Sequence, residues 1–272
     1  MPFAGLRSPW DWAADEQGAA AACNICGWSG PAFAGCQHSE SAICLACGSI
    51  ARDRFLFHCF VRRTPPGSYR VLETSPRLGV PYRRAMSDWF AYRASDFDER
   101  AHRADLHLDL QDLDLEDESV DVILTPHVLE HVPETGRALD EIHRVLAPGG
   151  RMFLQVPVQQ GRTAPPATPE LHGDSTPVFW RFGVDLTARL REHGFRARLL
   201  CTDGFYSLVE AGARTWPDPP SAEFDVDSIL AAARTADLLP IADREISRRL
   251  SFSPAYMFLT WEAVKAAAAG DP

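Results

Sequence analysis

Four cysteines near the N-terminus have the spacing of a metal site. They form two C-x2-C pairs separated by 17 residues, Cys23 with Cys26 and Cys44 with Cys47. Each pair turns two thiolates toward one point, and two such pairs complete a tetrahedron around Zn²⁺. Gly27 and Gly48 follow the pairs, where such a turn needs a residue that tolerates a positive φ angle. Because four thiolates fill the coordination sphere, the predicted zinc site is structural and not catalytic.

Two residues between the cysteine pairs offer alternative ligands. Either Cys36 or His38 could replace one of the four cysteines. The competing interpretation is that the pairs are incidental and that their thiols are buried or redox-active. Cys59 and Cys201 lie outside the cluster and are expected to be small core residues.

Acidic and histidine side chains follow apolar runs further along the chain. Glu73 ends one run before a turn, which is where a doubly wound fold places its ligand. About 20 residues further on, Asp96 ends another run, and a carboxylate there can accept hydrogen bonds from both ribose hydroxyls. His127 is a candidate general base, because a neutral imidazole can take up a proton near neutral pH. His131 is a second candidate, with capping or packing of a helix as its alternative role.

Alternating strands and helices are expected to position these side chains. Residues 135–146 have helical periodicity, with Ala138, Ile142 and Val145 on one face. This alternation predicts an α/β fold with a parallel sheet and helices on both faces. The predicted strands of the sheet are Tyr69–Thr74, Ala91–Ser95, Val120–Thr125 and Met152–Val156, followed by the pair Arg196–Cys201 and Ala255–Trp261.

The chain is expected to contain a small and a large domain. Residues 1–20 are a polar lead-in, 21–63 a zinc-ribbon-like domain and 64–272 the α/β domain. The boundary is the sequence TPPGS at residues 64–68, which breaks the helical pattern before it. A helical insertion at about 215–250 fits either a lid over a substrate or the contact surface of a homodimer.

Composition and charge exclude several classes of protein. The chain has 272 residues, of which 46% are hydrophobic, enough to bury a core, and a net charge of −10. An acidic surface repels phosphate backbones, so nucleic acid is not the expected partner. The sequence has no apolar run of membrane-spanning length and no signal peptide at its start. Seven cysteines then indicate a reducing compartment, and we expect a cytoplasmic protein without membrane attachment.

Three motifs occur in series after the linker. They are SDFD at residues 95–98, HVLEHV at 127–132 and RVLAPGG at 144–150. In this order they resemble the class I S-adenosylmethionine-dependent methyltransferases, over residues 69–200. The segments CNICG (23–27) and CLACGSIARDR (44–54) are similar to those of bacterial members that carry an N-terminal zinc ribbon. The resemblance implies a Rossmann-like sheet of seven strands with the last one antiparallel.

The resemblance also implies roles for individual residues. Glu73 would belong to the glycine-loop motif, and Asp96 would bind the ribose of the cofactor. Asp109 would lie by the adenine, and Pro126 and His127 would lie beside the methyl donor. The sequence LAPGG at residues 146–150 would form the turn into the fifth strand.

The glycine loop departs from the family pattern. Glycines are expected at positions occupied here by Ser75, Arg77 and Gly79, and only the last is a glycine. Glycines in such a loop let the backbone approach the ligand, so the Cβ atoms at 75 and 77 would crowd it. Arg77 is a hypothetical partner for the methionine carboxylate of the cofactor, since arginine suits carboxylate recognition.

The resulting functional hypothesis is a methyltransferase that uses S-adenosylmethionine and a structural Zn²⁺ and acts on a small molecule such as a natural product. Two alternatives are a non-methylating S-adenosylmethionine enzyme and a binding module without cofactor, whose zinc ribbon docks a protein or nucleic acid. The last alternative draws on the basic residues beside the ribbon, which are Arg52, Arg54, Arg62 and Arg63.

Overall fold

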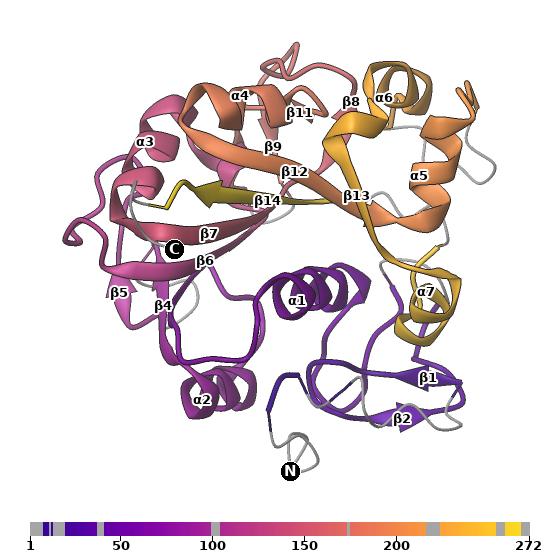
Figure 1. Ribbon diagram of the computed structural model, residues 1–272, viewed down its shortest axis with the longest axis horizontal. Coiled ribbons are helices and arrows are strands. Elements are labelled where there is room, and N and C mark those ends of the chain that lie inside the picture. The colour runs from indigo at the N-terminus through magenta and orange to yellow at the C-terminus, as the bar shows by residue number, and fades with distance from the viewer. Residues whose placement is uncertain are drawn as a thin grey trace.

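An eight-stranded mixed sheet forms the centre of the molecule (Figure 1). In spatial order its strands are β13 (Leu238–Ala242), β12 (Phe195–Thr202), β14 (Thr260–Lys265), β7 (Leu146–Gln155), β6 (Val120–Pro126), β3 (Arg70–Thr74), β4 (Ala91–Asp96) and β5 (Leu106–His107). Strand β14 runs antiparallel to β7 and β12, and the other neighbours are parallel. The predicted parallel sheet with an antiparallel strand is therefore confirmed. The computed structural model describes residues 8–10, 12, 20–36, 41–98, 104–172, 175–215, 224–253 and 259–267.

The C-terminal part of the sheet differs from the expectation in two ways. The insertion, expected to be helical, also contains β13, whose apolar sequence LLPIA pairs with β12 and adds an eighth strand. The helical parts of the insertion are α6 (Val226–Ala232), η3 (Thr235–Asp237) and α7 (Arg244–Leu250). The final strand begins at Thr260, later than the expected Ala255–Trp261, and residues 254–258 lie outside the described part.

Helices cover both faces of the sheet. On one face lie α3 (Thr135–Val145) and α4 (Leu186–Glu192), and on the other α1 (Ala51–Arg63) and α2 (Val80–Trp89) (Figure 1). The predicted face of α3 is confirmed, since Ala138, Ile142 and Val145 are fully buried. A further helix, α5 (Asp203–Glu210), follows β12. The short elements are β1 (Ala21–Ala22), β2 (Ser29–Gly30), β8 (Val158–Gln160), β9 (Glu170–Leu171), β10 (Pro177–Val178), β11 (Phe182–Gly183) and η2 (Leu129–His131).

Helix α1 joins the cysteine-rich segment to the core of the sheet. Its Phe60 is fully buried and packs against Phe153 of β7, with 5.8 Å between ring centroids. Arg54 is also fully buried, and its guanidinium donates to the carbonyl oxygens of Ala42, Ser49 and Leu250. Arg54 is therefore an internal brace and not part of a basic surface beside the ribbon.

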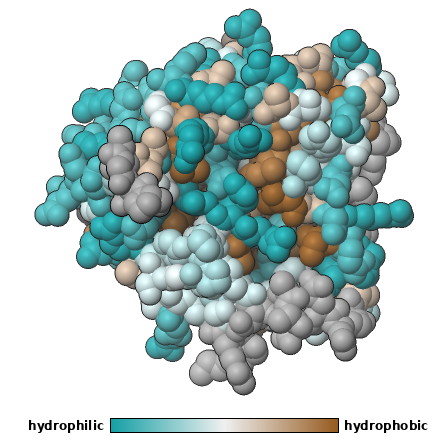
Figure 2. Space-filling view, in the orientation of Figure 1, coloured by the Kyte–Doolittle hydropathy of each residue, from teal (hydrophilic) through white to brown (hydrophobic). Residues whose placement is uncertain are grey.

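Two further expectations concern the burial of the cysteines outside the cluster and the lack of a membrane-spanning segment. Cys59 and Cys201 are buried, as predicted. Within the described ranges, no helix combines the length and the apolar character that crossing a membrane would need. The face seen in Figure 2 is mostly hydrophilic, with hydrophobic side chains gathered right of its centre.

Candidate functional site

The two C-x2-C turns bring four sulfur atoms together. All four Sγ atoms lie within 4.8 Å of one another, in a group made of Cys23, Cys26, Cys44 and Cys47. The two turns have the same construction. In each, the amide of the glycine donates to the carbonyl of the first cysteine, from Gly27 at 2.9 Å and from Gly48 at 2.7 Å. Both glycines have positive φ angles, 73° and 75°, as their positions predicted.

The cluster has the chemistry and the size that Zn²⁺ requires. The Sγ atoms of Cys23 and Cys47 are 3.7 Å apart, as are those of Cys26 and Cys44. Tetrahedral zinc with bonds of about 2.3 Å places its sulfur ligands roughly 3.8 Å apart. The Ser49 hydroxyl lies 3.4 Å and 3.2 Å from two of these sulfurs, where it can donate to metal-bound thiolates. Among the residues searched, the exposed Cys36 is not part of the cluster, and His38 lies outside the described residues.

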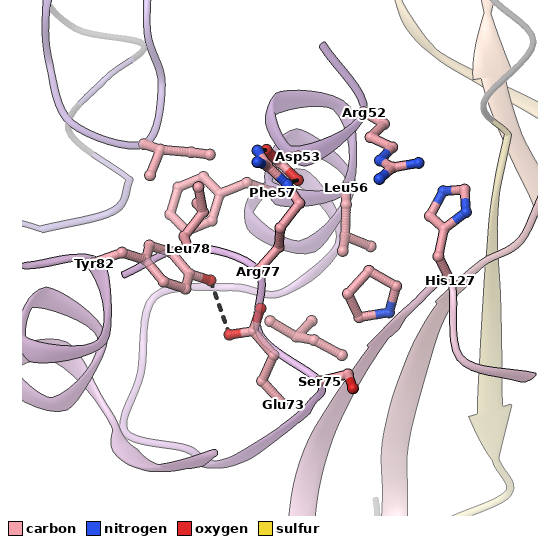
Figure 3. A pocket seen from close by; sticks show the side chains of 13 residues that line it. Arg52, Asp53, Leu56, Phe57, Glu73, Ser75, Arg77, Leu78, Tyr82 and His127 are labelled. Carbon is pink, nitrogen blue, oxygen red and sulfur yellow. Dashed lines mark hydrogen bonds and ion pairs between the residues drawn. The ribbon is translucent and has the colours of Figure 1, made fainter. Parts of the chain in front are cut away.

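A cavity lies at the carboxyl ends of β3 and β6, under α1 (Figure 3). Ligands of open α/β sheets bind at this end of the strands, near the point where the strand order reverses. The reversal lies beside β3, because β4 and β5 follow on one side of it and the chain then returns to β6 on its other side. The cavity is lined by Ile25, Arg52, Asp53, Leu56, Phe57, Glu73, Ser75, Arg77, Leu78, Tyr82, Leu124, Pro126 and His127.

Glu73 forms the floor of the cavity at the end of β3. Its Oε2 accepts hydrogen bonds from the hydroxyls of Tyr82 at 3.1 Å and Tyr92 at 2.8 Å. Burial raises the pKa of Glu73 to about 7, and the two tyrosine hydrogen bonds oppose that rise only in part. This carboxyl group is therefore largely protonated below neutral pH.

Ser75 links the loop after β3 to the carboxylate at the end of β4. Its Oγ donates to Oδ2 of Asp96 at 2.8 Å, and the amide of Asp98 donates to Oδ1 at 2.9 Å. Ser75 has a φ angle of 48°, in the left-handed region that glycine adopts without strain. The position thus keeps the backbone conformation of a glycine while its hydroxyl orients a neighbouring carboxylate.

Arg77 points from the same loop toward the cysteine-rich segment (Figure 3). Its guanidinium forms an ion pair with Asp53 in the first turn of α1 and donates to the carbonyl of Gly48 at 3.1 Å. Asp53 in turn accepts from the amide of Ile50 at 2.8 Å, which caps α1. Because Asp53 already neutralises Arg77, this geometry favours another cation as the partner of a cofactor carboxylate.

His127 and Glu130 form a largely buried pair after the end of β6, with side chains 12% and 3% exposed. The imidazole Nδ1 lies 3.4 Å from Oε1 of Glu130. Glu130 is 2% exposed, and neither oxygen of its carboxylate has a hydrogen-bond partner among the described residues. Burial is the largest effect on His127 and lowers its pKa, and Glu130 opposes this by raising it. His127 also has a φ angle of 53°, a strained conformation typical of functional positions.

Four candidate residues do not line the cavity. Asp96 is one of them, and it is joined to the cavity through its hydrogen bond with Ser75. His131 ends η2, and its Nδ1 lies 2.6 Å from the carbonyl oxygen of Pro177. Asp109 lies beyond β5 and accepts hydrogen bonds from Gln111. Gly79 is the N-cap of α2, with an ordinary φ angle of −73°.

Sequence reasoning missed three features of the site. Glu130 sits in HVLEHV, which looked like the start of a helix, and its spacing of three from His127 was the available signal. Arg52 belongs to the basic residues expected beside the ribbon, but its side chain lines the cavity with His127 (Figure 3). The tyrosines that hold Glu73 come from α2 and β4 and carry no sequence signal of their own.

The comparison with protein families identifies part of the sheet domain. Residues 81–154 match the family described as a methyltransferase domain. This segment of 74 residues lies within the central sheet, which has a Rossmann-like α/β architecture. A segment of 49 residues is 47% identical to an uncharacterized 37.1 kDa protein in transposon TN4556 of Streptomyces fradiae. That segment is 18% of this chain and only 14% of the relative.

Several solved structures are similar in chain path. One is the 1,6-didemethyltoxoflavin-N1-methyltransferase of Burkholderia thailandensis, with 15% identity, a TM-score of 0.46, and coverage of 79% of this chain and 78% of that one. A second is an S-adenosylmethionine-dependent methyltransferase of Mesorhizobium loti, with 16% identity, a TM-score of 0.42, and coverage of 77% and 97%. A third is the [4+2]-cyclase SpnF, with 18% identity, a TM-score of 0.45, and coverage of 88% and 89%.

Proposed function

Because residues 81–154 match a methyltransferase domain, we propose that the chain transfers the methyl group of S-adenosylmethionine to a small-molecule acceptor. One observation carries the proposal. A carboxylate suited to a ribose and a buried histidine–glutamate pair stand on either side of the strand-order switch, at the same edge of the sheet. The pair is suited to an acceptor that loses a proton.

The residues around the cavity suit the parts of the cofactor. Asp96 would accept from the ribose hydroxyls, with its carboxylate oriented by Ser75. Arg52 supplies positive charge on the cavity wall for the methionine carboxylate. Pro126 would lie beside the methyl donor, and Asp109 beyond β5 is the candidate for the adenine side.

The chain's own contribution to the reaction is alignment and proton uptake. S-adenosylmethionine supplies an electrophilic methyl group when bound. The acceptor then needs to be held in line and relieved of its proton. His127 can take that proton because its lowered pKa keeps the imidazole neutral at physiological pH. Glu130 would stabilise the imidazolium formed, since its carboxylate is buried 3.4 Å away. The expected acceptors are small molecules with a hydroxyl or an N–H group.

Calorimetric titration of the purified protein with S-adenosylmethionine and S-adenosylhomocysteine tests the cofactor. We expect binding that weakens at least tenfold in Asp96→Ala, a loss of about 1.4 kcal/mol. The exposed neighbour Asp98→Ala is the matched control and should bind within twofold of the unmodified protein. No binding by the unmodified protein would refute the function, whereas equal binding by Asp96→Ala would refute only the ribose contact.

A screen of small hydroxyl, amine and thiol compounds with labelled S-adenosylmethionine tests the reaction. A methylated acceptor together with S-adenosylhomocysteine supports methyl transfer. A product that lacks the labelled methyl group, formed only in the presence of the cofactor, would instead indicate non-methylating chemistry.

We also propose that the four-cysteine cluster binds one structural Zn²⁺. Cys44→Ser should lose the metal and lower the free energy of unfolding by several kcal/mol, because zinc binding in such sites contributes directly to folding. Cys36→Ser, at an exposed cysteine outside the cluster, should keep both metal and stability. Elemental analysis and urea unfolding measure the two effects, and a metal content unchanged by Cys44→Ser would contradict the assignment.

A further inference from the structure

The two residues that replace glycines in the loop after β3 each make a contact that glycine cannot make. Ser75 donates to Asp96. Arg77 reaches the cysteine-rich segment, where it pairs with Asp53 and donates to the carbonyl of Gly48. One contact orients a carboxylate of the proposed cofactor site, and the other fixes the loop from outside the sheet domain.

The outside anchor is part of the second C-x2-C turn. Gly48 follows Cys47 directly, and its amide donates to the carbonyl of Cys44 at 2.7 Å. The position of the Gly48 carbonyl therefore depends on the two thiols being held together. Asp53 depends on the same segment through its hydrogen bond with the amide of Ile50.

The first C-x2-C turn also reaches the cavity. Ile25, which stands between Cys23 and Cys26, is 1% exposed and lines the cavity wall. Both turns of the cluster thus contact the cavity or its loop, one by apolar packing and the other through Arg77. A structural change in either turn would therefore alter the contacts at the carboxyl end of β3.

We propose that Arg77 is a positioning residue that couples the metal site to the cofactor site. A loop held in its bound conformation saves the conformational entropy that ordering on binding would otherwise cost. In this chain the glycine pattern is replaced by a clamp from the metal-bound turn. The inference rests on the proposed function, since the coupled site is the one assigned to S-adenosylmethionine.

Coupling between two sites is reciprocal. If the metal-bound turn strengthens cofactor binding, bound cofactor must strengthen metal binding by the same factor. A direct contact between Arg77 and the methionine carboxylate would not have this consequence. That direct contact would also be absent with 5′-methylthioadenosine, which keeps the adenosine of the cofactor but lacks the amino acid.

The experiment measures both directions on the full-length, zinc-loaded protein. Calorimetry gives the affinities for S-adenosylhomocysteine and 5′-methylthioadenosine, and a colorimetric chelator gives the rate of zinc release with and without S-adenosylhomocysteine. We expect Arg77→Ala to weaken both ligands by about tenfold, within the usual range of coupling energies. We expect S-adenosylhomocysteine to slow zinc release from the unmodified protein and not from Arg77→Ala.

Two further variants guard against simple loss of folding. Asp53→Asn removes the charge partner of Arg77 but keeps an oxygen for the Ile50 amide, so it should reproduce the Arg77→Ala result. Arg234→Ala removes an exposed arginine that pairs with Asp237 in the insertion, and should change neither measurement.

The outcomes separate this inference from the proposed function. If the unmodified protein binds S-adenosylhomocysteine but its zinc release is unaffected by the ligand, the coupling is refuted and the cofactor site stands. If Arg77→Ala weakens S-adenosylhomocysteine but not 5′-methylthioadenosine, Arg77 is a direct carboxylate ligand and the clamp is refuted. If the unmodified protein binds neither ligand, the proposed function fails and the inference falls with it.

Discussion

The polar side chains on the two walls of the cavity differ in their hydrogen bonding. On the wall formed by the end of β3, the side chains of Glu73 and Ser75 both have hydrogen-bond partners, as does Asp96 of β4, which Ser75 contacts. On the wall formed by the residues after β6, His127 has a strained backbone. The carboxylate of its neighbour Glu130 is buried with no hydrogen-bond partner among the described residues. The polar side chains of the first wall thus have their hydrogen bonds without a ligand, whereas a carboxylate at the second wall does not.

The difference follows from what each wall is proposed to do. A binding surface gains affinity when its groups are already oriented, because less ordering is needed on association. A proton-transfer pair needs a group whose preferred charge state can change, and a buried carboxylate without donors favours a positive neighbour. The first wall therefore suits a cofactor, whereas the second suits the reacting acceptor.

The largest expected effect is on the β6 wall. His127→Asn should lower kcat with an acceptor from the screen by about 10²–10⁴-fold, the usual contribution of a general base. The affinity for S-adenosylhomocysteine should stay within twofold, since the proposed ribose contact lies on the other wall. Steady-state kinetics and calorimetry measure the two, and a parallel loss of affinity would break the division between the walls.

The pH dependence of that reaction follows from the same residue. Burial lowers the pKa of His127 below 6.5, so the neutral base is present at pH 7 and is lost as the pH falls through the lowered pKa. Glu130→Gln removes the group that raises this pKa, so the acid limb of kcat should move to lower pH. His131→Asn, outside the cavity, is the control and should leave the limb in place.

An intermediate effect is expected on the floor of the cavity. The folded-state pKa of Glu73 is raised from 4.5 to about 7, so folding favours the neutral carboxyl group. Its stabilisation is fully present below pH 4.5 and is lost as the pH rises through 7, a change of about 3 kcal/mol. Glu73→Gln stays neutral and can still accept from the tyrosines, so its stability should fall less between pH 5 and 8.

Urea unfolding at pH 5, 6, 7 and 8 measures this difference. Glu116→Gln, an exposed acid elsewhere on the surface, should show the same pH dependence as the unmodified protein. If Glu73→Gln also follows that curve, the carboxylate of Glu73 is ionised at low cost, and the floor is less complete than its hydrogen bonds indicate.

The smallest effect is expected for Ser75→Gly. The change removes a hydrogen bond worth roughly 0.5–1.5 kcal/mol and relieves a left-handed backbone that costs about 1–2 kcal/mol. Stability should therefore change little, while S-adenosylhomocysteine binds a few-fold more weakly because Asp96 loses its orienting donor. Ser75→Ala keeps the strain and loses the bond, so both stability and affinity should fall. An unchanged affinity in both variants would show that Ser75 does not prepare the cofactor wall.

Sequence patterns predicted the central strands and the main helix of the sheet domain better than the features that depart from regular periodicity. Periodicity located the helix at 135–146 and the central strands, because alternation and helical spacing report directly on burial. It missed β13, a short run interrupted by Pro240, within the insertion that was expected to be helical. It also treated Arg54 as a surface charge, because the pattern of a helix does not reveal three carbonyl oxygens from distant segments.

The features of the site likewise divide into those that the sequence predicted and those that it did not. The cysteine spacing predicted the cluster, since its geometry is encoded locally by two turns. Asp96 could be placed because a strand end has a defined position in a parallel sheet. The contact of Arg77 with the carbonyl of Gly48 depends on side-chain direction and on a distant segment, which spacing alone does not give.

Strand β13 has a consequence for how copies of this protein can meet. Exposed strand edges invite pairing with other chains, and proline or a very short edge strand prevents it. One edge of this sheet is β13, with Pro240 in its middle, and the other is β5, of two residues. Among the described residues, both edges of the sheet thus disfavour pairing with a further strand, and edge-to-edge aggregation is disfavoured.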